Sequence, residues 1–139
     1  MTDRVFVDTN VFVYLFDRDA PAKRAIASAL IEAHADTIVL STQVLQEFYV
    51  AVTRKLGKPL SESEAEAAVR RLAALSVVDT DVDLVLGAVV CSRRHRISCW
   101  DALIIEAALR AECSRLLTED LQHGRSFAGL AVENPFLDA

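Results

Sequence analysis

The stretch Val5-Phe6-Val7-Asp8-Thr9-Asn10 joins a short apolar run to three polar residues that favour turns and helix caps. The run Arg4–Val7 is rich in β-branched and aromatic side chains, so it predicts a strand that ends at Asp8. Runs of the same character predict further strands at Thr37–Leu40, Ser76–Asp79, Arg115–Thr118 and Leu130–Glu133. Helical patterns separate the first four runs, and strands that alternate with helices predict a parallel sheet covered on both faces. We therefore predict an α/β fold with a short parallel sheet of about four or five strands.

Helices between these strands are predicted from capping residues and from apolar side chains at helical spacing. Their expected starts are Asp19-Ala20-Pro21 with Asp19 as cap, Ser41 or Thr42, Ser61, Asp81 or Asp83, and Ser98. Ser61 and Glu64 fit a capping box, because the serine stands three residues before the glutamate. No linker, repeat or low-complexity tract interrupts the pattern, so we interpret residues 1–139 as a single domain.

The composition excludes several classes of protein. With 53% hydrophobic residues, the chain has enough apolar material to form a core, which excludes disorder. A net charge of −5 argues against a basic coat for nucleic acid, and the 4 glycines are too far apart for a GxGxxG or Walker loop. No signal peptide or apolar run of roughly 18 residues is present, so we expect a cytoplasmic protein without a membrane segment. Cys91, Cys99 and Cys113 form no CxxC pair and are expected to be buried free thiols.

Acidic residues stand where a parallel sheet places its ligands, beyond the carboxyl ends of the strands. Asp8 directly follows the first predicted strand, and the pair Glu119-Asp120 follows the fourth. Asp101 lies in the first turn of its helix, three residues after the expected cap Ser98. Glu47 lies beside the apolar stripe of the helix that follows the second strand. Each residue alone is also explained as a turn residue, a cap or a solvated side chain, but their joint placement favours one acidic site.

Four short motifs contain these residues and occur in a fixed order. They are Val5-Phe6-Val7-Asp8-Thr9-Asn10, Gln46-Glu47-Phe48, Trp100-Asp101-Ala102-Leu103-Ile104 and Leu117-Thr118-Glu119-Asp120-Leu121. This succession resembles the PIN-domain nucleases, in particular the VapC-like ribonuclease toxins of prokaryotic toxin–antitoxin pairs. The acidic positions of the family match Asp8, Glu47, Asp101 and Asp120, and its small polar positions match Asn10 and Thr118. The family pattern favours Asp120 over the adjacent Glu119 as the last site residue.

Four carboxylates that converge in one pocket repel one another, so such a cluster needs protons or cations. Oxygen ligands select hard ions, which implies one or two Mg²⁺ or Mn²⁺ ions rather than zinc. Asp8 and Asp101 are the expected direct ligands, and Asp120 is expected to bind directly or through water. Glu47 is expected to bind a second ion or to orient the attacking water.

The resemblance implies a metal-dependent endoribonuclease that hydrolyses phosphodiester bonds in RNA. It also implies a VapB-like antitoxin partner and a homodimer. Asn10 and Thr118 are expected to hold waters or carboxylates in place. Two alternatives stay open: a PIN-type nuclease of RNA processing without an antitoxin, and a non-catalytic acidic module that binds Mg²⁺ in signalling. A receiver-like module needs a lysine near its phosphorylated aspartate, and the chain has no lysine after Lys58.

Basic and aromatic residues near the motif helices are candidates for contacts to the substrate. Two basic clusters stand near the motif helices: Arg93, Arg94 and Arg96, and Arg54, Lys55 and Lys58. Either cluster can contact RNA phosphates, and either is equally explained by the preference of cations for helix C-termini. Trp100 can stack on a base, but the apolar helix around it favours packing in the core.

Overall fold

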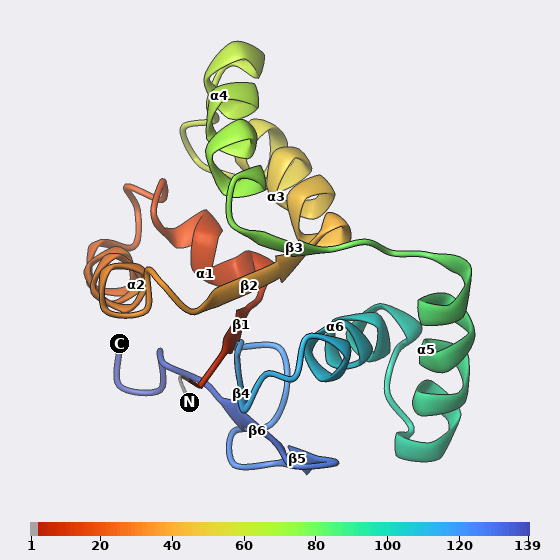
Figure 1. Ribbon diagram of the computed structural model, residues 1–139. Helices are drawn as coiled ribbons and strands as arrows, with labels where there is room; N and C mark the ends of the chain where they lie inside the picture. The colour runs from red at the N-terminus through yellow and green to blue at the C-terminus, as the bar shows by residue number, and fades with distance from the viewer. Residues whose placement is uncertain (1–2) are drawn as a thin grey trace.

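In the computed structural model, which describes residues 3–139, the central sheet has the strand order β3-β2-β1-β4-β6-β5 (Figure 1). The strands are β1 (Val5–Val7), β2 (Ile38–Ser41), β3 (Ser76–Val78), β4 (Arg115–Leu117), β5 (Ser126–Phe127) and β6 (Leu130–Glu133). Val5 pairs with Ile38 on one side and with Arg115 on the other, so β1 lies between β2 and β4, parallel to both. The carboxyl ends of these three strands therefore meet at one edge of the sheet.

Six helices of the described chain surround this sheet. They are α1 (Thr9–Tyr14), α2 (Pro21–Ala33), α3 (Thr42–Arg54), α4 (Glu62–Ala73), α5 (Val82–His95) and α6 (Cys99–Arg110). Figure 1 shows α1 and α2 to the left of the sheet and α5 and α6 to its right, while α3 and α4 stand at the top beyond β3. This arrangement confirms the predicted α/β fold with helices on both faces of a mostly parallel sheet.

Side chains cap most of the helices at the predicted positions. Ser41, Ser61, Asp81 and Ser98 are the N-caps of α3, α4, α5 and α6. Ser61 and Glu64 form the complete capping box, in which each side chain bonds the backbone N–H of the other residue. These caps satisfy N–H groups that have no partner within their own helix, which explains why local sequence predicts them well.

Two helix starts differ from the prediction. The segment Thr9–Tyr14 forms α1, a helix of 6 residues that is too short to show an apolar period and that the sequence pattern does not predict. Asp8 is its N-cap, and the carboxylate accepts a hydrogen bond from the backbone N–H of Thr9. The prediction of Asp19 as the cap of α2 is wrong, since Ala20 occupies the N-cap position and Pro21 begins the helix.

Strand β5 is a further departure from the predicted all-parallel sheet. Its 2 residues pair antiparallel with β6, with Phe127 opposite Leu130. The turn between them places Ala128 and Gly129 at φ 50° and 89°, in the left-handed region that glycine adopts at little cost. A strand this short has no alternation to recognise, so the pattern of side chains does not predict it.

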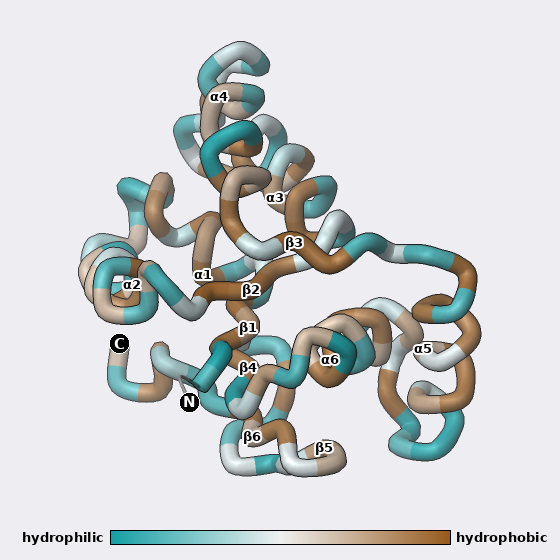
Figure 2. Tube along the Cα trace, viewed as in Figure 1, coloured by the Kyte–Doolittle hydropathy of each residue, from teal (hydrophilic) through white to brown (hydrophobic). Residues whose placement is uncertain are grey.

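The core consists of the strands and of one face of each major helix. Figure 2 shows the strand residues in brown at the centre of the molecule and also shows α5 largely brown at the right-hand margin. Cys91 and Cys113 are buried as predicted, but Cys99 is exposed at the start of α6, so the prediction of three buried thiols is wrong for this residue. In the part of the chain that the structure describes, no helix is both long and apolar enough to span a membrane.

Candidate functional site

Asp8 stands at the carboxyl end of β1, in the middle of the sheet edge. Its side chain is 6% exposed, and its backbone N–H bonds the carbonyl of Leu117 on β4 at 3.0 Å. Oδ1 accepts a hydrogen bond from the N–H of Thr9 at 2.7 Å, and Oδ2 accepts one from the hydroxyl of Thr118 at 2.8 Å. The carboxyl group is thus oriented by two donors that are far apart in sequence, Thr9 at the start of α1 and Thr118 directly after β4.

Thr118 and Asn10 connect Asp8 to Asp120. The hydroxyl oxygen of Thr118 accepts a hydrogen bond from the backbone N–H of Asp120 at 3.0 Å. Nδ2 of Asn10 donates to Oδ2 of Asp120 at 3.1 Å and to the hydroxyl of Thr118 at 3.4 Å. The structure therefore brings together Asp8, Asn10, Thr118 and Asp120, which the sequence predicted as site residues.

Glu119 faces a different part of the molecule from Asp120. Oε1 of Glu119 accepts a hydrogen bond from the hydroxyl of Tyr14 at 2.5 Å, and Oε2 forms an ion pair with Nζ of Lys23 at 3.2 Å. Asp120 instead meets Asn10 at the end of β1. The two adjacent acidic residues thus have separate partners, and the geometry favours Asp120 as the member of the candidate site.

Asp101 occupies the first turn of α6, where its N–H bonds the hydroxyl of Ser98 at 3.0 Å. Its side chain is partly buried, and this burial, together with the nearby charge of Asp120, raises the pKa of the Asp101 carboxyl group. The negative charge of Asp120 thus disfavours the ionised form of Asp101.

Glu47 lies on the exposed side of α3, and a glutamine holds its side chain. Oε1 of Glu47 accepts a hydrogen bond from Nε2 of Gln43 at 2.7 Å. The same nitrogen donates to the carbonyl of Trp100 at 3.2 Å, so Gln43 links α3 to the start of α6. The sequence prediction missed Gln43, although its position four residues before Glu47 is the spacing at which helix side chains meet.

Burial raises the pKa of Asp8 to about 7. The hydrogen bonds from Thr118 and Thr9 oppose this increase, and the negative charges of Asp120 and Glu47 add to it. At neutral pH a substantial fraction of Asp8 is therefore protonated when no cation is bound. Binding of a divalent cation would favour the ionised carboxylate and displace this proton.

The residues present fit a hard divalent cation. All four candidate ligands are carboxylates, and the buried Oδ1 of Asn10 has no hydrogen-bond partner within residues 3–139. Within the same residues, however, no three His, Cys, Asp or Glu side chains are close enough together to form a complete metal site. Hydrogen bonds through Asn10 and Thr118 join Asp8 to Asp120. Asp101 and Glu47 belong to α6 and α3. Asp101 and Glu47 would have to approach Asp8 and Asp120 to complete the ligand set.

The other predicted contact residues have mixed outcomes. Three exposed arginines stand at the end of α5: Arg93, Arg94 and Arg96. Their side chains make no hydrogen bond to another residue of the described range 3–139. Their role in substrate binding stays a prediction. Trp100 is 69% exposed, so the prediction that it packs in the core is wrong. It occupies the first turn of α6, where its side chain projects beyond the packed face of the helix.

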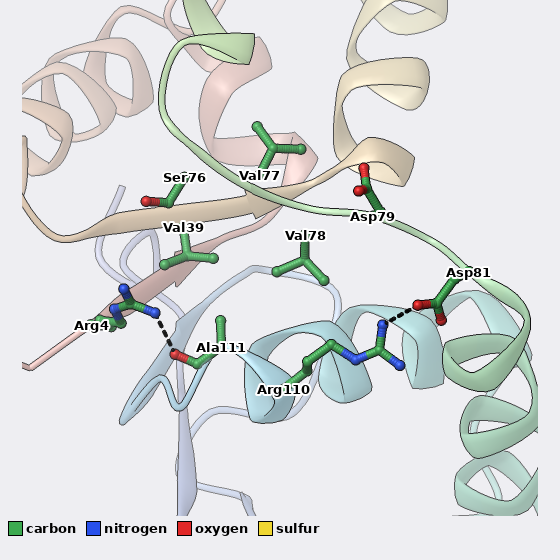
Figure 3. A pocket seen from close by; sticks show the side chains of 9 residues that line it. All are labelled: Arg4, Val39, Ser76, Val77, Val78, Asp79, Asp81, Arg110 and Ala111. Atoms are coloured by element: carbon green, nitrogen blue, oxygen red, sulfur yellow. Dashed lines mark hydrogen bonds and ion pairs between the residues drawn. The ribbon is translucent and has the colours of Figure 1, made fainter.

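A separate hollow of about 390 Å³ lies along β3 (Figure 3). Arg4 and Arg110 line it, but their guanidinium groups bond protein oxygens: the carbonyl of Ala111 at 3.0 Å and the carboxylate of Asp81 at 2.8 Å. None of the four candidate carboxylates lines this hollow. We therefore treat it as separate from the candidate site.

Comparison with known proteins identifies the family. The profile of the PIN domain matches residues 5–126, which is most of the chain, so the chain belongs to the PIN domain family. None of the curated proteins compared with it matches significantly.

Several solved structures share the fold. A toxin–antitoxin complex from Klebsiella pneumoniae has 19% identity and a TM-score of 0.70 over 94% of this chain and 97% of that chain. The DNA-bound VapBC of Salmonella typhimurium has 16% identity and a TM-score of 0.68 over 96% and 99%. VapC20 of Mycobacterium tuberculosis, described as a toxin that cleaves the sarcin-ricin loop, has 20% identity and a TM-score of 0.66 over 81% and 86%.

Proposed function

We propose that this protein is a metal-dependent endoribonuclease and the toxin of a toxin–antitoxin pair. The proposal depends on one observation: Thr118 and Asn10 join the carboxyl groups of Asp8 and Asp120 at the carboxyl edge of the sheet. Membership of the PIN domain family supports nuclease chemistry, and similarity to VapC toxins supports RNA as the substrate.

In this proposal the carboxylates bind Mg²⁺ or Mn²⁺ and prepare a water molecule for attack. Asp8 and Asp101 are direct ligands, and Asp120 binds directly or through water. When bound, the cation neutralises charge on the scissile phosphate and lowers the pKa of the attacking water. Glu47 orients this water or binds a second ion. Asn10 and Thr118 hold the carboxylates of Asp120 and Asp8 in position through the hydrogen bonds described above.

Cleavage of RNA by the purified full chain tests this proposal. With Mg²⁺ or Mn²⁺, Asp8→Asn and Asp101→Asn should each lower the rate by at least about a hundredfold, since the cation contributes several kcal/mol to stabilisation of the transition state. Asp36→Asn is the matched control, because Asp36 is exposed and precedes β2 at the opposite edge of the sheet. Full activity of either site variant, or equal activity in a chelator, would contradict the proposal.

The antitoxin part of the proposal has its own test. Neighbouring structures include toxin–antitoxin complexes, which supports a VapB-like protein as the partner of this chain. A small DNA-binding protein encoded beside this chain should co-purify with it and inhibit RNA cleavage. If cleavage depends on the carboxylates but no such protein inhibits it, the chain is instead a PIN nuclease of RNA processing.

A homodimer through α5 is the proposed assembly. Val82, Val85, Leu86, Val89 and Val90 leave an apolar face of this helix exposed, which we call the α5 face. Such a patch on a surface helix is typical of a protein interface. Acidic Asp83 stands near one end of the helix and basic Arg93 near the other. A twofold contact with antiparallel helices would pair these opposite charges, which favours a second copy of this chain as the occupant.

A further inference from the structure

A groove of about 520 Å³ lies between α3 and the start of α6. Its lining includes Gln43, Gln46, Glu47, Val50, Lys55 and Trp100. Glu47 belongs both to this groove and to the candidate carboxylate site, and Trp100 directly precedes Asp101 in sequence. A ligand bound at the carboxylates can therefore extend into the groove.

The groove combines an apolar wall with a polar rim. Trp100 and Val50 are exposed there and supply apolar surface. The side chains of Gln46, Glu47 and Lys55 are also exposed and supply hydrogen-bonding and charged groups. A cleft of this size with an aromatic side chain and a few polar groups is typical of a small-ligand site.

Gln43 holds the two walls of the groove together. It is almost fully buried, and its Nε2 donates to Oε1 of Glu47 at 2.7 Å and to the carbonyl of Trp100 at 3.2 Å. Because these bonds attach the backbone of Trp100 to α3, the base of the indole side chain has a defined position relative to Glu47. A backbone that is already held in place loses less conformational freedom when a ligand binds.

We propose that the groove binds a nucleobase of single-stranded RNA beside the scissile phosphate, with the base stacked on the indole of Trp100. This inference rests on the proposed ribonuclease function. The amide of Gln46 can bond the edge of the base, and the ammonium group of Lys55 can bond a backbone phosphate. With a net charge of −5, the protein has little general attraction for RNA, and stacking supplies affinity without net charge.

The lining favours a nucleotide over a protein segment. The centre of a protein interface is depleted in charged residues, whereas Glu47 and Lys55 both line this groove. Five of the exposed large hydrophobic residues in the described chain belong to the α5 face, on a different helix.

The fluorescence of Trp100 provides a direct test, because Trp100 is the only tryptophan in the sequence. The full chain with the Asp8→Asn substitution, in a chelator, is titrated with a single-stranded oligoribonucleotide. An abasic oligomer of the same length carries the same phosphates without bases. We expect the oligoribonucleotide to quench Trp100 and the abasic oligomer to leave its emission unchanged.

Substitutions then measure what the stack contributes. Trp100→Ala should weaken binding of labelled RNA by roughly tenfold, the effect expected for loss of one base–aromatic stack, and Trp100→Phe should retain part of the affinity. Leu137→Ala removes an exposed apolar side chain outside the groove and is the matched control. Lys55→Ala should reduce the salt dependence of binding, whereas Lys58→Ala, outside the groove lining, should not.

The outcomes separate this inference from the proposed function. If the unsubstituted protein cleaves RNA and Trp100→Ala leaves both KM and kcat unchanged, the base site is wrong and the ribonuclease proposal stands. If RNA quenches Trp100 but no metal-dependent cleavage occurs, the ribonuclease proposal fails and the groove still binds bases. If the abasic oligomer quenches Trp100 as much as the oligoribonucleotide does, the proposed stacking of a base is wrong. A blue shift of Trp100 with the antitoxin, without any response to RNA, overturns the inference by assigning the groove to a protein interface.

Discussion

The hydroxyl of Thr118 donates a hydrogen bond of 2.8 Å to Oδ2 of Asp8, across 110 residues of sequence. Both residues are buried, and the bond lowers the pKa of a carboxyl group whose burial raises it. The same hydroxyl accepts the N–H of Asp120. Thr118 therefore influences both the protonation of Asp8 and the position of Asp120, and several experiments follow from this pair.

Thr118→Val tests that hydrogen bond directly. Valine has nearly the same shape but cannot donate, so Oδ2 of Asp8 would lose its partner in a buried site. We expect the free energy of unfolding at neutral pH to fall by about 1–3 kcal/mol and RNA cleavage to weaken. Thr118→Ser retains the hydroxyl and should keep most of both quantities. Urea unfolding and cleavage rates measure the effects, and equal behaviour of the two variants would exclude a role for the hydroxyl.

The raised pKa of Asp8 predicts a pH dependence of stability. An unfolded aspartate has a pKa of about 4, so between about pH 4 and 7 the folded, metal-free protein binds the extra proton. The free energy of unfolding should therefore decrease as the pH rises through this window, by up to about 4 kcal/mol in total. Asp8→Asn should lack this decrease. Urea titrations in a chelator at several pH values measure it, and parallel pH curves for the two proteins would contradict the prediction.

Metal binding should stabilise the unsubstituted protein more than its site variants. Without metal, Asp8→Asn or Asp101→Asn relieves repulsion and should leave the melting temperature unchanged or higher. With several millimolar Mg²⁺ or Mn²⁺, the unsubstituted protein should gain more in melting temperature than either variant, because only its site is complete. Thermal unfolding with and without metal checks this. Asp36→Asn should respond as the unsubstituted protein does, and equal shifts in all proteins would count against a shared site.

The different surroundings of Glu119 and Asp120 predict different effects of one chemical change. Asp120→Asn removes a charge from the candidate site and should abolish most metal-dependent cleavage. Glu119→Gln weakens the contacts to Tyr14 and Lys23, which are partly exposed, and should cost less than about 1 kcal/mol of stability with most activity retained. Cleavage rates and unfolding of the two variants provide the comparison. A larger loss of activity in Glu119→Gln would reverse the assignment.

The α5 face predicts a dimer that a charge disrupts. Leu86 is 59% exposed at its centre, and Leu86→Glu would place a carboxylate in the contact. We expect sedimentation to show a dimer for the unsubstituted protein and a monomer for this variant, with helix content unchanged. Leu137→Glu, on an exposed residue outside α5, is the control. If the unsubstituted protein is a monomer, the proposed dimer is wrong.

Much of this fold and site could be predicted from local pattern. Four of the helix caps and the five longer strands depend on neighbouring residues, so short-range chemistry is enough to recognise them. The acidic residues were predicted because Asp8 and Asp120 each follow a strand, and parallel strands bring such positions to one edge of the sheet. Glu47 and Asp101 are indicated by their positions in two helices, and the order of the motifs and the family resemblance strengthen that prediction. Of the predicted site residues, the structure brings Asp8, Asn10, Thr118 and Asp120 together through hydrogen bonds.

Orientation and exposure depended on segments that are remote in sequence. Glu119 and Asp120 are adjacent, and only the positions of Lys23, Tyr14 and Asn10 determine which partner each one meets. Trp100 has the apolar neighbours of a core residue, yet it is 69% exposed at the start of α6. The raised pKa of Asp8 likewise comes from burial by surrounding elements. Local pattern determines the backbone elements and the residue types of the site. Packing between distant segments determines which side chains are exposed, which carboxyl groups carry a charge and which partners they face.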